Sequence, residues 1–281
     1  MSHPAATLPT MGGKIRSIAV AIALTATALT GCSSPDTPAP SESSTASSAS
    51  EESIDGSDPI DAPDPYTQPA NFKELLQRVR SAVILIGCGD YYGTGWIIDT
   101  AAPPVIRKGL KSTFAAERSS LVITNEHVVR RCAKDPKKDF RGYHKGLEVS
   151  LEILNYNREH DVALVSMNAA RPGLRATSKP EQGTWALAVG FPLEFYVPVP
   201  VTGSVVGTLD EMIVLQMPIQ HGNSGSPVLN SEGLVTATAN SVYLDDNGEQ
   251  STGWTEASST RTLCLHLFDC TTAPITQPTS P

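Results

Sequence analysis

The chain has 281 residues, with a hydrophobic content of 40% and a charged content of 18%, which supports a sizeable core and one or two domains. The net charge is −8, and it is unevenly distributed: residues 33–68 hold eight acids and no Lys or Arg, whereas residues 69–281 hold 21 acids and 19 bases. A near-neutral body without a basic stripe excludes a nucleic-acid footprint.

Residues 1–31 have the pattern of a signal peptide. An apolar run from Ile18 to Leu29 follows two basic residues; it is short for a transmembrane helix and typical of a signal-peptide core. The run ends in Leu-Thr-Gly-Cys, which resembles the lipobox of bacterial lipoproteins. That resemblance implies that Cys32 is acylated and anchors the protein at the extracytoplasmic face of the cell membrane. Ordinary secretion with an incidental cysteine is the alternative, and translation could also begin at Met11.

Residues 32–68 are predicted to form a disordered linker. The segment is rich in Ser, Thr, Pro, Ala and acids, so it buries too little apolar surface to offset the entropy of ordering. Proline and like charges extend such a segment. A stalk that holds the body away from the membrane and simple low-complexity filler are both compatible with this composition.

The folded body is expected over residues 69–270, with a disordered tail at 271–281. Asn71 followed by Glu74 predicts a helix start. The apolar residues that follow fall on one helical face: Phe72, Leu75, Leu76 and Val79. A second, closing helix is predicted over Ser258 to Phe268, with Leu263 and Leu267 facing inward.

Between these helices the pattern is that of strands. Leu147, Val149, Leu151 and Ile153 alternate with polar residues, as in a half-buried strand. Other apolar runs lie at 83–86, 96–98, 121–123, 162–167, 185–190, 201–208, 212–217 and 233–239. Many short strands with Gly and Pro turns predict an all-β domain. Residues 100–120 form a longer connection, and the sequence does not decide between a functional loop and a tolerated insertion.

Three short segments carry the candidate chemistry. Ser224 lies in Gly222-Asn223-Ser224-Gly225, where small neighbours leave the hydroxyl clear and let backbone amides converge as an oxyanion hole; the same run is also a good turn. A serine nucleophile needs a base and an anchor for that base. His127 follows a β-branched run, and Asp161 opens another apolar run. The order His, Asp, Ser is one of the known orders of this triad.

Five segments together resemble the trypsin-like serine peptidases of the HtrA and glutamyl-endopeptidase branches. They are Thr-Asn-Glu-His-Val-Val, His-Asp-Val-Ala-Leu, Gly-Asn-Ser-Gly-Ser-Pro, Gly-Thr-Gly-Trp-Ile-Ile and Leu-Ala-Val-Gly-Phe-Pro, within residues 72–260. The resemblance implies a chymotrypsin-like fold of two six-stranded Greek-key barrels, at about 83–175 and 182–257, with the active site in the cleft between them. It further implies a protein or peptide substrate and no cofactor.

On this resemblance, Ser224 is the nucleophile, His127 the general base and Asp161 its orienting group. Gly222, Asn223 and Ser224 supply the oxyanion-hole amides. Asn223 stands where the trypsin branch has Asp, so activation by a freed N-terminus is not expected.

Two positions depart from the relatives. His221 replaces the proline usual in HtrA proteins, and it is expected to point to solvent. The strand at 234–239 lacks the histidine of glutamyl endopeptidases, so a small or apolar preference is expected rather than glutamate. His144 and His160 are expected at the surface.

Four cysteines remain besides Cys32, and from the residues alone all three pairings are open. The peptidase resemblance favours Cys88–Cys132, beside the catalytic histidine, and leaves Cys264–Cys270. An oxidising compartment permits both. There is no Cys-x-x-Cys pair and no histidine at zinc spacing from these cysteines, so no metal site is predicted.

The leading hypothesis is a membrane-anchored extracytoplasmic serine endopeptidase that works through an acyl-enzyme. The rival is a catalytically latent lipoprotein that keeps the peptidase fold as a binding or sensing module. A lipase or esterase is disfavoured because Ser226 stands where its nucleophile motif needs glycine. The oligomeric state stays open.

Overall fold

The computed structural model describes residues 64–99, 118–135, 137–178, 180–209, 211–244, 250–270 and 275–276. The predicted signal peptide, Cys32, nearly all of the predicted linker and most of the 100–120 connection lie outside the described residues. The last residues of the predicted linker are described, and they contact the body: the Trp185 amide donates to Pro65 O (2.8 Å). The body therefore includes residues from Asp64 onward.

Helix α1 (Phe72–Ala82) is amphipathic and runs directly into the first strand, as expected from its apolar spacing. Leu75 and Val79 are buried, while Phe72 and Leu76 pack at the edge of the core. The Phe72 ring meets Trp185 edge-on at 6.0 Å between centroids, so α1 rests on the second barrel while it leads into the first. Among the described residues, no helix is long and apolar enough to cross a membrane.

The first six strands form a closed barrel in the order β1-β2-β3-β6-β5-β4. Its strands are β1 (Val83–Cys88), β2 (Tyr91–Ile97), β3 (Ser120–Thr124), β4 (Phe140–His144), β5 (Leu147–Asn157) and β6 (Val162–Met167). Every residue of β1 and β6 is buried, which explains their predominantly apolar sequences. In β5 the expected alternation is only partial, because Leu147 at its start is 68% exposed.

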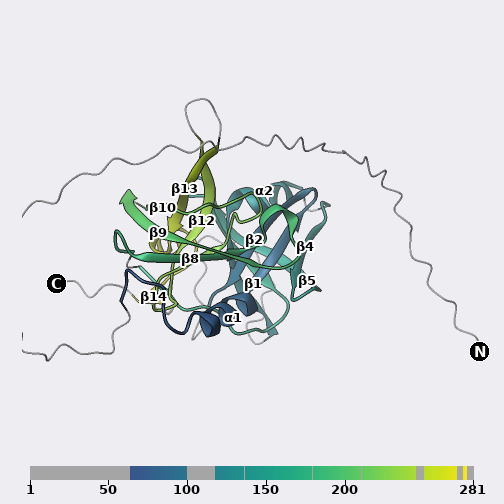
Figure 1. The fold of residues 1–281 in the computed structure, drawn as a ribbon. Coiled ribbons are helices and arrows are strands. Elements are labelled where there is room, and N and C mark those ends of the chain that lie inside the picture. Colours follow the sequence, from purple (N-terminus) through teal and green to yellow (C-terminus); the bar gives the residue numbers. More distant parts are fainter. Residues whose placement is uncertain are drawn as a thin grey trace, which may run out of the picture. The chain divides into compact units, whose positions relative to one another are not determined.

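The second barrel closes in the order β11-β8-β9-β10-β13-β12, with β11 paired to β12. Its strands are β8 (Trp185–Gly190), β9 (Val199–Leu209), β10 (Met212–Gln216), β11 (Pro227–Leu229), β12 (Val235–Leu244) and β13 (Gln250–Ser259). The one-turn helix η2 (Pro192–Glu194) lies between β8 and β9. Figure 1 shows β4 and β5 of the first barrel on one side and β10 and β13 of the second on the other. The two six-stranded barrels confirm the predicted fold class.

Two short strands extend the second sheet from β12 in parallel: β7 (Ala176–Thr177) and β14 (Ile275–Thr276). Ile275 pairs with Ala176, so this part of the predicted disordered tail is attached to the barrel. The closing helix α3 (Thr260–His266) begins two residues later than predicted, because Ser258 and Ser259 still belong to β13. Leu263 and Leu267 are buried as expected.

Helix α2 (Glu126–Lys134) is not expected from the sequence. Its four apolar or small residues, Val128, Val129, Cys132 and Ala133, form too short a pattern to distinguish it from the neighbouring strands. The helix carries Cys132, which is bonded to Cys88 at the end of β1; Cys264 is bonded to Cys270. Both bonds are the pairings that the peptidase resemblance favours.

Candidate active site

The three candidate triad residues come from three different elements. His127 lies in the first turn of α2, just after β3, and Asp161 lies in the turn between β5 and β6. Both belong to the first barrel. Ser224 lies between β10 and β11 of the second barrel. This is the division between barrels that the sequence resemblance implies.

Asp161 holds His127 by two hydrogen bonds. The backbone N–H of a first-turn helix residue has no acceptor within the helix, and in His127 it donates to Asp161 Oδ1 (2.9 Å). The other carboxylate oxygen, Oδ2, lies 2.7 Å from His127 Nδ1. A carboxylate at the positive end of a helix is also favourably placed.

The Asp161 contact determines which imidazole nitrogen can act as a base. A carboxylate only accepts, so the proton of a neutral His127 lies on Nδ1 and the Nε2 lone pair is left for a substrate-side proton. Asp161 itself adopts a left-handed backbone conformation (φ 49°), which aspartate tolerates better than most residues. The turn thus directs the carboxylate back onto α2.

Ser224 is in a different arrangement from the one that catalysis requires. Its hydroxyl donates to the backbone carbonyl of Asn240 in β12 (2.9 Å). Across the described part of the chain, no hydrogen bond joins Ser224 Oγ to His127. Since a serine has one hydroxyl hydrogen, the hydroxyl must rotate before His127 can accept its proton.

The loop before Ser224 presents two unoccupied amides. Among the described residues, neither the Gly222 nor the Ser224 N–H has an acceptor, whereas the Asn223 N–H donates to Gln220 O (3.0 Å). The sequence assigned all three amides to the oxyanion hole. Within the described residues the Asn223 amide closes a turn, so of the three predicted amides those of Gly222 and Ser224 remain available to a ligand.

Glycine is required at positions 222 and 225, on either side of Asn223 and Ser224. Gly222 has φ 93°, and a Cβ there would lie 2.2 Å from Phe191 O. Gly225 has φ 88°, and a Cβ there would lie 1.9 Å from Thr94 O. Left-handed backbone and these close approaches both exclude a side chain.

Thr94 of β2 binds the loop 222–225, which carries the predicted oxyanion-hole amides, to the first barrel. Its N–H donates to Ser224 O (2.7 Å), and its hydroxyl donates to Gly222 O (2.8 Å) and accepts from the Phe191 N–H (3.0 Å). The side chain is fully buried. Thr94 lies in one of the segments that carry the family resemblance, but the sequence assigns it no role.

The Asn223 side chain does not help to hold the loop 222–225 against the first barrel. Its side chain is 1% exposed, and neither its amide oxygen nor its amide nitrogen has a partner within the described residues. The position of the loop therefore depends on Thr94 and on backbone hydrogen bonds.

A polar network behind the site connects the two barrels. Asn125 Nδ2 donates to Asp161 O (2.9 Å) and to Asn240 Oδ1 (2.7 Å). Asn240 Nδ2 donates to Ser258 Oγ (2.8 Å), and Ser258 Oγ donates to His160 O (2.8 Å). Asn240 thus accepts directly from Ser224 and is connected to Asp161 through Asn125. Asn125 and Asn240 were not found by sequence reasoning, because neither residue type is distinctive without its partners.

A buried ion pair supports α2. Glu126 is 3% exposed and accepts from Arg130 Nε (2.6 Å), one helical turn later. The hydrogen bond that Arg130 donates to Glu126, together with the negative charges of Glu126 and Asp161, raises the pKa of Arg130 against the opposing effect of burial. The guanidinium therefore keeps its charge beside the helix turn that carries His127.

Residues 234–239, which were expected to line the specificity pocket, include side chains that face the interior of the protein instead. Thr238 of β12 is fully buried, and its hydroxyl accepts a hydrogen bond from Trp96 Nε1 of β2 (3.1 Å). Ala239 belongs to the core of the second barrel. The Thr238 side chain consequently joins the two barrels and does not face a substrate.

The remaining histidines divide into three environments. His221 is exposed, as expected. His144 was expected at the surface, but it is 4% exposed and its Nε2 lies 2.8 Å from Ser81 O at the end of α1. His160 is half-buried and contacts Glu211. The sequence could not show either contact, since Ser81 and Glu211 are far along the chain.

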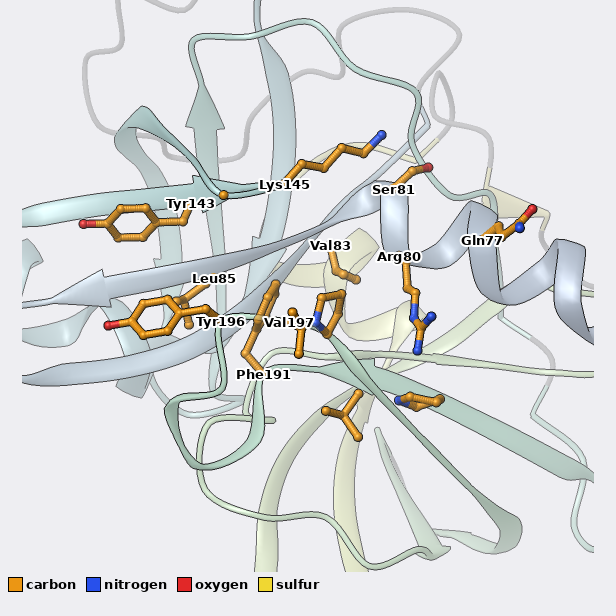
Figure 2. Close-up of a pocket in the computed structure, with 14 residues that line it drawn as sticks. Gln77, Arg80, Ser81, Val83, Leu85, Tyr143, Lys145, Phe191, Tyr196 and Val197 are labelled. Atoms are coloured by element: carbon orange, nitrogen blue, oxygen red, sulfur yellow. The ribbon is translucent and has the colours of Figure 1, made fainter.

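A cavity of about 960 Å³ adjoins the oxyanion loop on the side of Phe191. Figure 2 shows Phe191, Tyr196 and Val197 facing Val83 and Leu85 of β1, below the end of α1. None of the candidate triad residues lines it. The cavity is mainly apolar, and Arg80 and Lys145 supply cations among its lining residues.

The chain resembles known proteins over the region that contains these elements. A family model described as trypsin-like peptidase domain matches residues 93–237. A protein named "Probable periplasmic serine endoprotease DegP-like" from Chlamydia trachomatis is 26% identical over 159 residues, which is 52% of this chain and 31% of that protein. The chain thus spans about a third of the length of this relative.

Two solved structures share the fold. One is an inactive serine-to-alanine form of Rv3671c from M. tuberculosis, with a TM-score of 0.52 and 16% identity, covering 74% of this chain and 94% of that one. The other is the serine endoprotease from Yersinia pestis, with a TM-score of 0.54 and 16% identity, covering 71% and 66%. The family match covers half of the chain and parts of both barrels, so the protein belongs to the trypsin-like peptidase family.

Proposed function

We propose that the protein is a serine endopeptidase in which Ser224, His127 and Asp161 form the catalytic triad. The observation that carries this proposal is the pair of hydrogen bonds that His127 donates to Asp161, because the one from Nδ1 leaves the Nε2 lone pair free. That lone pair is the group that a serine nucleophile requires.

The reaction begins when the Ser224 hydroxyl leaves Asn240 O and turns to His127. His127 Nε2 takes the hydroxyl proton while Oγ bonds to the carbonyl carbon of the substrate. The negative oxygen that forms is bound by the Gly222 and Ser224 amides, which have no other acceptor among the described residues. His127 then gives the proton to the leaving amine, and an acyl-enzyme remains. Water, activated by the same imidazole, releases the acid.

Fluorophosphonate labelling of the purified full-length protein tests this function. Wild type is expected to be labelled, and Ser224→Ala and His127→Ala are expected to lose labelling. His221→Ala is the matched control, because it removes an exposed imidazole next to the same loop and is expected to label like wild type. Labelling that persists in His127→Ala would contradict the assigned base.

The rival function is a latent peptidase fold that acts as a binding or sensing module. The hydrogen bond from Ser224 to Asn240 O favours it, because the hydroxyl is held away from its base. If the folded wild-type protein is not labelled and hydrolyses no member of a peptide library, the latent module is the correct description.

We further propose that the protein is a lipoprotein held at the outer face of the cell membrane through Cys32. The support is the Leu-Thr-Gly-Cys sequence after a signal-peptide core, together with the periplasmic name of the chlamydial relative. Cys32→Ala protein is expected to appear in the soluble fraction and to incorporate no labelled palmitate. A Cys32→Ala protein that stays in the membrane fraction would contradict the anchor.

A further inference from the structure

Three side chains that the catalytic proposal does not use converge next to Asp161. His160 lies in the turn between β5 and β6, Glu211 between β9 and β10, and His266 at the end of α3. His160 and Glu211 are 51 residues apart in the sequence, and Glu211 and His266 are 55 residues apart, so no short sequence motif predicts the cluster. One donor atom from each lies within 4.8 Å of the donor atoms of the other two.

The carboxylate lies between the two imidazoles. Glu211 Oε2 is 3.2 Å from His160 Nδ1 and 3.1 Å from His266 Nε2. The two rings stack with centroids 3.9 Å apart and planes at 17°. All three side chains are about a quarter exposed, between 24% and 27%, so an ion can reach them from solvent.

These separations suit a tetrahedral metal ion. Zn²⁺ binds histidine nitrogen and carboxylate oxygen at about 2.0–2.1 Å, which places two ligand atoms of a tetrahedron about 3.3 Å apart. The two N···O distances are close to that value. The nearly parallel rings must tilt toward Glu211 for both lone pairs to converge, and their solvent-exposed sides leave room for this movement.

The backbone of each residue is held in place by neighbours. His160 O accepts from Ser258 Oγ (2.8 Å), and Glu211 O accepts from the Ser259 N–H (2.9 Å). His266 O accepts from Asn155 Nδ2 (3.5 Å). Because the three donors start from fixed positions, little chain entropy is lost when a ligand binds them.

The surroundings favour a cation. A cavity of about 220 Å³ beside the cluster has four acidic residues among its lining residues: Glu159, Asp161, Glu211 and Glu256. Among the described residues that line it there is no Lys or Arg. A concave surface lined by charges of one sign concentrates ions of the other sign.

We propose that His160, Glu211 and His266 form a binding site for a divalent transition-metal ion of the Zn²⁺ class. Two imidazoles and one carboxylate are a donor set that suits such ions better than Mg²⁺ or Ca²⁺, which prefer oxygen donors alone. The sequence predicts no metal site because it offers no cysteine or histidine spacing, whereas the fold assembles one across both barrels.

The site has a consequence for the peptidase. The ion would join the β5–β6 turn of the first barrel to the β9–β10 turn and α3 of the second. His160 is the residue before Asp161, so this link would hold the turn that orients His127. Metal binding is therefore expected to stabilise the folded protein and to reduce the mobility of Asp161.

The test is Zn²⁺ titration of the chelator-treated full-length protein by calorimetry, with Co²⁺ absorption spectra as a report of tetrahedral coordination. Wild type is expected to bind about one ion per chain and to melt at a higher temperature with Zn²⁺. Glu211→Gln and His266→Asn are expected to weaken binding by at least about 100-fold.

Two controls exclude other histidines. His127→Asn and His221→Asn are expected to bind Zn²⁺ like wild type, because neither residue belongs to the cluster. Circular dichroism establishes that each variant is folded, and His160→Asn replaces any variant that is not. If folded wild type binds no Zn²⁺, the cluster is an ion pair only and the proposal is wrong. Binding that is lost in His127→Asn and kept in His266→Asn would also overturn it.

Discussion

The hydroxyl of Ser224 donates its hydrogen bond to the backbone carbonyl of Asn240, 2.9 Å away, and not to His127. The same residue, Asn240, accepts from Asn125 through its side chain, and Asn125 also donates to Asp161 O. The nucleophile and the orienting acid are therefore connected through two buried amides, and the strength of that connection can be tested.

Asn125→Ala is expected to lower both stability and labelling by fluorophosphonate. The change removes two buried hydrogen bonds and leaves Asn240 Oδ1 and Asp161 O without this donor, which costs about 1–3 kcal/mol for each group. Asn125→Asp is the matched variant: it keeps the shape, loses the donor and adds a negative charge near Asp161. It should be more harmful than Asn125→Ala in thermal melts and labelling rates, and a milder effect would contradict the role of the Nδ2 donor.

Thr94→Val is expected to reduce kcat without abolishing folding. Valine keeps the volume but leaves Gly222 O without its donor and the Phe191 N–H without its acceptor. Removal of a donor of an oxyanion hole itself costs about 100-fold or more in kcat, so loss of Thr94, which only positions the donors, is expected to cost up to about 100-fold. Thr94→Ser retains the hydroxyl and should keep most of the activity. Equal kcat values for the two variants, measured on one peptide substrate, would exclude this role.

Thr238→Val is expected to destabilise the junction between the barrels by about 1–3 kcal/mol, because the buried Trp96 N–H loses its acceptor. Thr238→Ser keeps the acceptor and serves as the control. Urea unfolding followed by tryptophan fluorescence measures the difference. If Thr238→Val is as stable as Thr238→Ser, the Trp96 bond contributes nothing.

The two disulfides are expected to differ in their contribution to stability. The Cys88–Cys132 bond closes a loop of 44 residues and the Cys264–Cys270 bond a loop of 6. Loop-closure entropy assigns them about 4 and 2 kcal/mol, respectively. Replacing both cysteines of each pair by alanine and comparing urea midpoints tests this order. Loss of the Cys88–Cys132 bond should also reduce labelling, since this bond ties β1 to the helix that carries His127. A larger loss of stability on removal of the Cys264–Cys270 bond would contradict the predicted order.

Local sequence accounts for much of the candidate site. His127 follows the β-branched strand β3, and Asp161 precedes the fully buried, mainly apolar strand β6. Each position is dictated by patterns only a few residues long. Gly222 and Gly225 are dictated in the same way, because the loop around Ser224 needs left-handed backbone there. The α1 and α3 helices likewise follow from the spacing of their apolar residues.

The parts that sequence reasoning missed depend on residues far apart in the chain. Helix α2 has only nine residues, and its stability comes from packing and from the bond between Cys132 and Cys88. His144 appears polar and exposable in the sequence, but it is buried, with its Nε2 2.8 Å from Ser81 O at the end of α1. No local pattern predicts either outcome.

The sequence by itself determined the order of the candidate triad, the all-β class and the residues that a tight oxyanion loop demands, because these follow from short-range backbone and periodicity rules. Only the tertiary structure decided that Ser224 bonds to Asn240, that Thr94 and Asn125 join the barrels, and that His160, Glu211 and His266 meet. Among those contacts, Thr94 and Gly222 are 128 positions apart and Asn125 and Asn240 are 115 positions apart, so their free energy exists only once both barrels have closed and packed together.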